Sequence, residues 1–451
     1  MVRLTARWVL PIAAPPIENG ELIVDGDSIA YCGPERESSL SGSGIVNYAL
    51  GEAVLMPGFV NVHTHLEYTA LRGFLEDIAF FPWIRALTAV KANLNRDDWL
   101  ASARLGALEC IRGGITSIGD NTDAGVTAQV ASEYGLRARV YREVFGIDHR
   151  QPVEERMAVL EAGIAEIAAY AGDLVEIGVS PHAPYTVRPE LFHALARYCE
   201  LNRLRTSIHL AESPAESDLI MSGAGPFAEM FVRRGIEWAT PGVTPTRYLA
   251  DLGALTPNTL CVHCVHQSAV DIAIIERCGA AIAHCPISNA KLGAGIAPLR
   301  SWLELPNIPV GIGTDSAVSN NSLDMFEEMR FAIFAQRAQS ESIALSAEQM
   351  VSTATRGGAM ALGLQDRIGV LAPGMRADIA GVRLDTLNSS PATDPFAALV
   401  YSSRANDVCL TMVNGRILYR DGEFTVADSA EVMRIACEAR EKIASATPTA
   451  Q

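Results

Sequence analysis

Histidines and acids follow short apolar segments at several separate places in the 451-residue chain. His63 and His65 end the first such segment. Residues two apart on a strand point to the same face, so both imidazoles can reach one ion. An isolated HxH pattern is a weak signal, since two polar loop residues would look the same. His209 and Asp315, which end two other segments, strengthen it, because three imidazoles and a carboxylate suit a divalent ion such as zinc and leave a position for water.

Two further residues could move protons beside such an ion. Glu212 lies three residues after His209, near enough to act as a general acid or base on water at the metal. A surface acid is the alternative for Glu212. His263, within CVHCVH, could orient and polarise the same water, and a hydrogen-bonded core histidine is its alternative. We interpret His266 as a bystander at the start of the following helix.

Weaker signals surround these positions. His284 and Asn289, in the segment HCPISNAKLGAG, could support the site from a strand-to-helix loop, although ordinary loop chemistry accounts nearly as well for Asn289. Cys261 and Cys264 form a CxxC pair, but no second pair follows at zinc-ribbon spacing. Their odd offset on a strand sends them to opposite faces, so we interpret both as packing thiols.

The segments that carry these residues alternate with amphipathic stretches between Pro57 and Gly369. Eight strand and helix repeats over about 310 residues predict an α/β protein with a TIM (β/α)8 barrel. A doubly wound sheet is the rival fold, but no GxGxxG follows the first strand. The active site of such a barrel lies at the carboxyl ends of its strands, where the histidines and acids would meet. The predicted strands are 59–63, 115–119, 138–144, 175–182, 205–212, 259–264, 280–285 and 309–315.

The two ends of the chain have a different pattern. Both show apolar alternation around Asp-Gly or Asn-Gly pairs, in 20–33 and in 407–424, which is typical of hairpins. Two such ends could pair into one small sheet. We therefore predict a composite β-sandwich domain from residues 1–57 and 370–451, and a metal-binding (β/α)8 barrel from residues 58–369.

Composition limits the possible partners and surroundings. Lys and Arg number 36 against 52 Asp and Glu, a formal charge of −16, so no positive field exists to collect nucleic-acid polymers. The nine cysteines are an odd number spread along a large chain, as in reduced cytoplasmic proteins. Neither a secretory signal nor a run of eighteen apolar residues is visible, so we expect a cytoplasmic protein without a membrane partner.

Taken in order, these motifs resemble the amidohydrolase superfamily over almost the whole chain. PGFVNVHTHLEYTALRG, SIHLAESPAE, CVHCVH, HCPISNAKLGAG and GTDSAVSNNSLDMFEEMR are similar to its mononuclear-zinc branch, and DRIGVLAPGMRADIAGVRL to its closing β segment. That branch holds 5′-methylthioadenosine/S-adenosylhomocysteine deaminases, aminodeoxyfutalosine deaminases and s-triazine chlorohydrolases. The resemblance implies a hydrolase of C–N bonds in cyclic amidines.

The resemblance also implies a role for each site residue. In hydrolytic deamination, water activated at the metal attacks the carbon that bears the amine, and ammonia leaves. Glu212 would protonate the ring nitrogen, His263 would activate the water, and Asp315 would take the proton of that water. The implied ligands of one divalent ion, most simply Zn²⁺ with Fe²⁺ or Mn²⁺ as alternatives, are His63, His65, His209 and Asp315.

The lysine content agrees with a single ion. Dinuclear branches of the superfamily usually bridge two metals through a carbamylated lysine at a barrel strand end. Only three of the 36 basic residues are lysines, and none follows a predicted strand in the required place: Lys91, Lys291 and Lys442.

Substrate contacts follow from the same resemblance. His182, in SPHAPYTV, would contact a purine ring, and we also assign Trp83 to the substrate-binding set. Arg142 would meet the far end of the substrate, where an arginine fork suits a carboxylate. An ion pair of Arg142 with Glu143 or another acid is an equal alternative.

Two departures from the family leave the substrate open. The glutamate that binds ribose hydroxyls in related deaminases is missing, since Lys91 stands where it should fall. Residues 213–248 are also long for the family, as a lid would be, with a surface excursion or an oligomer contact as alternatives. We predict a homo-oligomeric deaminase of an adenine-type nucleoside such as aminodeoxyfutalosine, S-adenosylhomocysteine or 5′-methylthioadenosine. Hydrolysis of s-triazines, pterins or free bases is the second hypothesis, and an inactive structural barrel, which the intact ligands disfavour, is the third.

Overall fold

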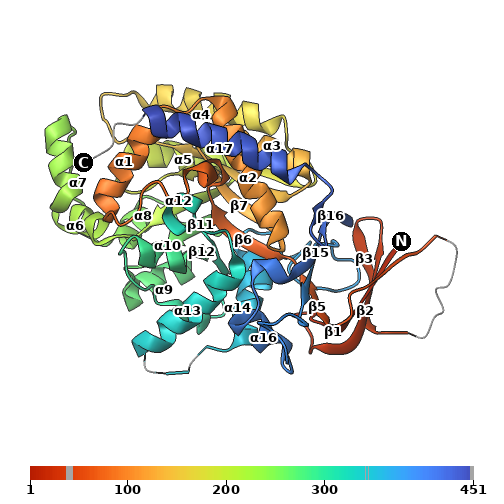
Figure 1. Cartoon of the computed structure of the whole chain (residues 1–451). Coiled ribbons are helices and arrows are strands. Elements are labelled where there is room, and N and C mark those ends of the chain that lie inside the picture. The colour runs from red at the N-terminus through yellow and green to blue at the C-terminus, as the bar shows by residue number, and fades with distance from the viewer. Residues whose placement is uncertain (37–43, 341, 344, 447–451) are drawn as a thin grey trace.

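Two sheets organise the chain, and Figure 1 shows a helix-covered barrel beside a smaller sheet that contains the first strands. The computed structural model describes residues 1–36, 44–340, 342–343 and 345–446. Among these residues, no helix is both long enough and apolar enough to cross a membrane. The predicted TIM barrel with a second sheet built from both termini is confirmed.

The barrel consists, within the described residues, of eight parallel strands that neighbour one another in sequence order. All eight predicted strands are present, with bounds that differ from the prediction by a few residues at most. Every position of the first strand is buried, as is typical of parallel strands covered on both faces. The strands are β6 (Phe59–Thr64), β7 (Ile115–Thr122), β8 (Arg137–Val144), β9 (Val175–Pro181), β10 (Arg205–Leu210), β11 (Thr259–His263), β12 (Ala281–His284) and β13 (Val310–Ile312).

Helices surround the barrel and begin at sequence-encoded caps. The side chain of Asn95 accepts the N–H groups of Asp97 and Asp98, and Ser268 caps a later helix in the same way. The helices around the barrel are α1 (Phe80–Lys91), α2 (Arg96–Arg112), α3 (Val126–Tyr134), α4 (Val153–Ala168), α5 (Pro189–Asn202), α6 (Pro214–Ser222), α7 (Gly225–Arg234), α8 (Pro245–Asp251), α9 (Ala269–Cys278), α10 (Pro286–Lys291), α11 (Leu299–Leu303), α12 (Ala317–Asn320), α13 (Met325–Ser340), α14 (Ala347–Ser352) and α15 (Gly358–Ala361). The others are α16 (Pro395–Tyr401), α17 (Ser429–Ala446) and the helical turns η1 (Leu66–Leu71), η2 (Thr353–Gly357) and η3 (Ala405–Asp407).

The barrel closes where the last strand meets the first. The backbone N–H of Asp315 donates to the carbonyl of His63 at 2.9 Å, and Thr64 forms a parallel bridge with Asp315. Gly313 lies at this contact, where a Cβ would stand 2.9 Å from the Cβ of His63. Only glycine permits such a close approach, so this residue brings two predicted metal ligands together.

The second sheet joins the two ends of the chain. Within the described residues its order is β17-β16-β15-β14-β5-β1-β2-β3, with β4 paired to β1. β5 and β14 pair antiparallel, which ties the N-terminal strands to the C-terminal ones, and a buried ion pair of Arg137 with Asp378 (2.7 Å) links this sheet to the barrel. The domain boundaries at 57/58 and 369/370 stay predictions. The strands are β1 (Val2–Val9), β2 (Ile17–Asp25), β3 (Ser28–Pro34), β4 (Val46–Ala49), β5 (Ala53–Pro57), β14 (Ile379–Arg383), β15 (Val408–Val413), β16 (Arg416–Arg420) and β17 (Glu423–Phe424).

Candidate active site

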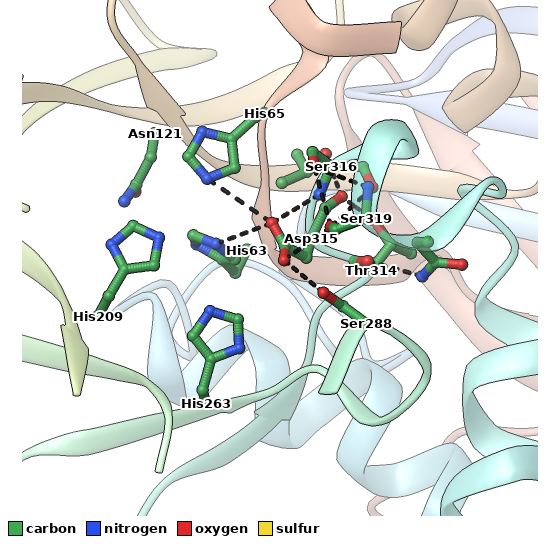
Figure 2. A network of polar contacts seen from close by, with 12 residues as sticks. His63, His65, Asn121, His209, His263, Ser288, Thr314, Asp315, Ser316 and Ser319 are labelled. Atoms are coloured by element: carbon green, nitrogen blue, oxygen red, sulfur yellow. Dashed lines mark hydrogen bonds and ion pairs between the residues drawn. The ribbon is translucent and has the colours of Figure 1, made fainter. Parts of the chain in front are cut away.

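Four imidazoles and one carboxylate meet at the carboxyl ends of the barrel strands (Figure 2). Nε2 of His63 and Nε2 of His65 lie 3.6 and 3.7 Å from Oδ1 of Asp315. One ring nitrogen from each of His63, His65 and His209 lies within 4.8 Å of the other two. One possible ligand atom from each of His63, His263 and Asp315 also lies within 4.8 Å of the other two. The fold therefore assembles all four predicted metal ligands from three strands that are far apart in sequence.

The hydrogen bonds of these imidazoles show that a cation fits between them. Both ring nitrogens of His63 and Nδ1 of His65 are buried and have no hydrogen-bond partner in the described part of the chain. Nδ1 of His209 donates to the carbonyl of His182 at 2.9 Å, which leaves Nε2 of His209 free as a ligand atom. Buried polar atoms without partners are costly, and a bound divalent metal ion would satisfy them.

The charge states of these groups suit a metal ion. Burial lowers the pKa of His65 and His209 well below the ordinary value and lowers the pKa of His263 to about 4. These imidazoles are therefore neutral at physiological pH, as metal ligands must be. Burial alone would raise the pKa of Asp315, but its interaction with His63 outweighs burial and holds that pKa well below its usual range. Asp315 is therefore ionised.

Two serines and a backbone amide hold the carboxylate of Asp315. Its Oδ2 accepts hydrogen bonds from Oγ of Ser288 (2.6 Å) and Oγ of Ser319 (2.9 Å), and its Oδ1 accepts one from the N–H of Ser316 (2.6 Å). Asp315 itself has a φ of 59°, a left-handed conformation that is costly outside glycine and typical of functional sites. These serines were not among the predicted site residues, although they lie in α10 and α12, the short helices that follow β12 and β13.

Glu212 and His263 face each other beside the predicted metal position. Nδ1–H of His263 donates to Oδ1 of Asn289 at 2.9 Å, which directs Nε2 into the site, 3.7 Å from Oε1 of Glu212. Burial, with the charges of Asp315 and Glu216, raises the pKa of Glu212 well above its ordinary value. This shift favours the protonated form of Glu212, which is the form that a proton donor needs. Asn289 supports His263 as the sequence suggested.

A second buried acid fixes the position of Glu212. Glu216 accepts the backbone N–H groups of Ala211 (2.8 Å) and Glu212 (3.0 Å) and is fully buried. Ala211 has a φ of 50°, so the turn that aims Glu212 is held in a left-handed conformation. Glu216 was not among the predicted residues, and its signal in the sequence is an acid four residues after Glu212, at the start of α6.

The other histidines and cysteines that the sequence singled out pack within the protein. His284 ends β12, is buried, and packs its ring 5.7 Å from the ring of Trp302. Nε2 of His266 lies 2.9 Å from the carbonyl of Ala294. Cys261 and Cys264 are buried free thiols. Each of the three lysines stands on a helix rather than a barrel strand: Lys91 on α1, Lys291 on α10 and Lys442 on α17.

A cavity of about 1030 Å³ opens above the ligand cluster. His65, His209, Glu212, His263 and Asp315 are among the residues that line it. This volume accommodates a nucleoside with a further substituent. Two predicted substrate contacts also line the cavity: His182, whose pKa burial lowers to about 3, and the buried side chain of Trp83.

Arg142 is not among the described residues that line this cavity. Side chains alternate along β8, so Glu143 faces the cavity while the guanidinium of Arg142 packs near Gly163 of α4. Nη1 of Arg142 donates to the carbonyl of Thr122 and lies 3.9 Å from the carboxylate of Asp123. The substrate contact of Arg142 stays a prediction, and the geometry favours the alternative of an ion pair with another acid.

Residues 213–248 build one wall of the cavity. They form α6, α7 and the start of α8, and Phe227 of α7 stacks on Tyr185 with ring centroids 4.3 Å apart. Phe227 also meets Phe81 of α1 edge to face at 5.2 Å. Together with Trp83 these aromatic side chains enclose the cavity, so the long segment contributes to the site. Movement of this segment as a lid stays a prediction.

Comparisons with known proteins agree with this geometry. The amidohydrolase family matches residues 54–418. A 5-methylthioadenosine/S-adenosylhomocysteine deaminase of Moorella thermoacetica is 33% identical over 432 residues, which covers 94% of this chain and 95% of that protein. A 5′-deoxyadenosine deaminase of Methanothermobacter thermautotrophicus is 33% identical over 386 residues, 85% and 86% of the two chains.

Solved structures are similar over the whole chain. An adenosine deaminase from Xanthomonas campestris with bound zinc superposes with a TM-score of 0.87 at 27% identity, and the match covers 98% of each chain. An atrazine chlorohydrolase from Arthrobacter aurescens, complexed with zinc, has a TM-score of 0.84 at 24% identity, with coverage of 98% and 100%. This second likeness shows the fold alone.

Proposed function

This chain belongs to the amidohydrolase family, and we propose that it is a zinc-dependent deaminase of an adenine-type nucleoside. The observation that carries the proposal is the buried carboxyl of Glu212, 3.7 Å from Nε2 of His263, at the edge of the histidine cluster. A proton donor beside a metal site is what removal of an amine from a heterocycle requires. The relatives with 33% identity are named for deamination of adenine nucleosides, which supports this substrate class.

The ligand set defines what a bound ion would contribute. His63, His65, His209 and Asp315 would hold it, and three imidazoles with one carboxylate favour zinc. When bound, such an ion lowers the pKa of water and stabilises developing negative charge. The zinc in the Xanthomonas adenosine deaminase structure supports this choice over iron or manganese. Elemental analysis of the protein purified without added metal tests it: zinc near one ion per chain is expected, and iron or manganese in its place would contradict it.

The protein residues then handle the protons of the reaction. Nε2 of His263 orients the attacking water, and the carboxylate of Asp315 accepts one of its protons. The carboxyl of Glu212 donates its proton to the ring nitrogen next to the carbon that bears the amine. The proton on Asp315 passes to the departing amine, which leaves as ammonia. The hydroxyl proton on the attacked carbon restores Glu212, so each group ends as it began.

The position of Arg156, and not that of Arg142, is evidence for a substrate with an anionic group at its far end. Arg156 of α4 lines the cavity, its Nε is buried, and its guanidinium has no hydrogen-bond or ion-pair partner among the described residues. An arginine fork without a partner suits a carboxylate. We therefore favour a nucleoside with a carboxylate-bearing substituent, such as S-adenosylhomocysteine or aminodeoxyfutalosine, over 5′-methylthioadenosine.

A substrate panel tests the function. Zinc-loaded protein is assayed for ammonia release from adenosine, 5′-deoxyadenosine, 5′-methylthioadenosine, S-adenosylhomocysteine and aminodeoxyfutalosine. Activity on at least one nucleoside is expected. Silence on all of them, with ammonia or chloride released from s-triazines, pterins or free bases, would favour the second hypothesis. A chain that binds no metal would revive the inactive barrel.

The Arg156→Met variant tests the carboxylate, with Arg142→Met as the matched control. Arg156→Met is expected to lower kcat/KM about 10- to 100-fold for substrates with a carboxylate and leave 5′-methylthioadenosine within about twofold. Arg142→Met is expected to change both classes alike. If Arg142→Met lost activity only on substrates with a carboxylate, and Arg156→Met changed both classes alike, Arg142 would be the substrate contact.

Two further proposals concern the cellular compartment of the protein and its oligomeric state. The nine cysteines all lie among the described residues and are free thiols, which supports a reducing compartment such as the cytoplasm. We also propose a homo-oligomer, on the family resemblance. Light scattering coupled to size-exclusion chromatography tests it, and a mass of one chain would contradict it.

A further inference from the structure

One buried acid joins the two short helices that hold Asp315. Glu328 belongs to α13, is 1% exposed and is not among the described residues that line the cavity. Its Oε2 accepts the backbone N–H of Ile287 in α10 at 3.2 Å, and its Oε1 accepts the side-chain amide of Asn320 in α12. The two oxygens of one carboxyl group therefore bind two segments that follow different barrel strands.

Each of these helices supplies one of the hydroxyl groups that hold Asp315. Ser288 directly follows Ile287 in α10. Ser319 directly precedes Asn320 in α12. Both serines donate to Oδ2 of Asp315, at 2.6 and 2.9 Å (Figure 2). Each hydrogen bond to the buried acid is thus made one residue away from a serine that orients a predicted metal ligand.

Asn320 extends this connection to the strands that carry the ligands. Its Nδ2 also donates to the carbonyl of Thr314, the residue before Asp315, at 2.7 Å. The N–H of Thr314 donates to Oδ1 of Asn61 at 3.0 Å, and its Oγ1 accepts Nδ2 of Asn61 at 2.8 Å. Asn61 stands on β6, two residues before His63. A continuous set of hydrogen bonds therefore runs from α13 to two segments that supply metal ligands.

The chemical type of Glu328 indicates a positioning role. Within the described residues, the carboxyl of Glu328 binds these two amide donors and forms no ion pair with Lys or Arg. Burial raises the pKa of Glu328 well above its ordinary value despite the two hydrogen bonds, so the charged form is destabilised here. An acid buried without a counterion is costly, and stability alone does not explain it. A carboxyl group does, however, offer two acceptor oxygens, whereas an amide offers one.

Resting on the proposed function, we propose that Glu328 is a positioning residue for Asp315. It fixes α10 and α12 relative to each other, so that the hydroxyls of Ser288 and Ser319 meet the same oxygen of Asp315. With Oδ2 bound in this way, Oδ1 is the oxygen that faces the imidazoles, 3.6 Å from Nε2 of His63. Glu328 thereby sets which oxygen of Asp315 is presented to the metal ion and to the attacking water.

The first test measures the affinity of the metal-free protein for Zn²⁺ by competition with a chelating dye, which needs no turnover. Glu328→Gln keeps the size of the side chain but turns an amide N–H toward one of the two donors. It is expected to weaken Zn²⁺ binding about 10- to 100-fold and to lower kcat by a similar factor. Asn320→Ala removes only the connection to α12, and about 2- to 10-fold weaker binding is expected.

Asp324→Asn is the matched control. Asp324 directly precedes α13 and also accepts two backbone N–H groups, those of Phe326 (2.8 Å) and Ala405 (3.1 Å). It forms no hydrogen bond with α10 or α12 in the described part of the chain. Asp324→Asn is expected to lower the free energy of unfolding of the metal-free protein but to keep Zn²⁺ affinity and kcat within about twofold of wild type. Weakening of Zn²⁺ binding equal to that of Glu328→Gln would overturn the proposal.

A double-mutant cycle separates positioning from a general loss of rigidity. In a Ser288→Ala/Ser319→Ala background the hydroxyls through which Glu328 acts are absent, so Glu328→Gln is expected to change Zn²⁺ affinity there by no more than about twofold. An equal factor in both backgrounds would contradict the proposal, as would wild-type Zn²⁺ affinity in Glu328→Gln. If Glu328→Gln does not fold, Asn320→Ala carries the same cycle with Ser319→Ala. Zn²⁺ affinity that follows this pattern in a chain that deaminates no nucleoside would support the role of Glu328 and refute the proposed function.

Discussion

The floor of the cavity and its wall differ in how their polar groups are held. In the floor, formed by His63, His65, His209, Glu212, His263 and Asp315, the protein fixes three groups: a carbonyl fixes His209, Asn289 fixes His263, and two serines fix Asp315. The floor atoms without a partner among the described residues are nitrogens of two predicted metal ligands, His63 and His65. The wall, formed by Trp83, Lys91, Glu143, Arg156 and Phe227, contains polar atoms that have no partner within the described residues, namely Nε1 of Trp83, Oε1 of Glu143 and Nε of Arg156.

This difference separates the reaction from the choice of substrate. Groups that must keep their geometry through a reaction are oriented in advance by their own hydrogen bonds. Groups that recognise a substrate stay without partners until it binds. We infer that changes in the floor alter turnover for every substrate, whereas changes in the wall alter which substrates are used.

The largest effect is expected at Asp315, the carboxylate of the predicted ligand set. Asp315→Asn removes the negative charge that balances the bound cation and the base that accepts the proton of water. Activity is expected to fall at least about 10⁴-fold, and metal content to fall well below one ion per chain. Steady-state kinetics and elemental analysis measure both. A variant that keeps its metal and substantial activity would show that the floor is not organised around Asp315.

A smaller loss is expected at Glu212. Glu212→Gln keeps the size of the side chain but removes the proton that the ring nitrogen receives, so kcat should fall about 10²- to 10⁴-fold on every nucleoside. Metal content should be unchanged, because Glu212 is outside the ligand set. A loss confined to one substrate would mean that Glu212 recognises that substrate and does not take part in the reaction itself.

Removal of a support should cost less than removal of the group it supports. Asn289→Ala takes away the acceptor that fixes Nδ1–H of His263, and kcat should fall about 10- to 100-fold. Asn289→Asp keeps an acceptor oxygen at that place and should recover part of the activity. Equal activity of the two variants would mean that the hydrogen bond to His263 does not set its orientation.

The smallest expected effect is on the free energy of unfolding. It tests whether the carboxyl of Glu143 has no partner in the substrate-free protein. Burial raises the pKa of Glu143 from 4.5 to about 8. The folded chain therefore holds this proton to higher pH than the unfolded chain does, and the free energy of unfolding falls between those two values as pH rises. The slope is at most about 1.4 kcal/mol per pH unit for one group. Urea unfolding of the substrate-free protein at several pH values should show a shallower fall for Glu143→Gln. Parallel curves would mean that Glu143 already has a partner.

Much of the floor could be predicted from the sequence because its signals are local. An apolar run of strand length that ends in a histidine or an acid specifies both the strand and the position of the polar residue at its end. His63, His209 and Asp315 were found in this way. The second sheet followed from turn residues, which are equally local.

Apart from Trp83 and the segment that carries Phe227, the wall could not be predicted because its residues have no shared pattern. Arg142 and Glu143 are neighbours on one strand, and alternation says only that they face opposite sides. The closure of the barrel decides which side is inside, and it selects Glu143. Arg156 reaches the cavity from α4, an arrangement that depends on how this helix packs over the strand ends.

The sequence by itself therefore determined the barrel, its eight strands and the kinds of groups at their ends, because period and residue type are properties of short segments. Only the tertiary structure decided which groups meet and which stay unpaired. The contact at Gly313 that sets Asp315 beside His63, the bond that orients His263, and the empty surroundings of Glu143 all depend on segments distant in the chain. Distance, burial and pairing arise when such segments pack, so no local pattern carries them.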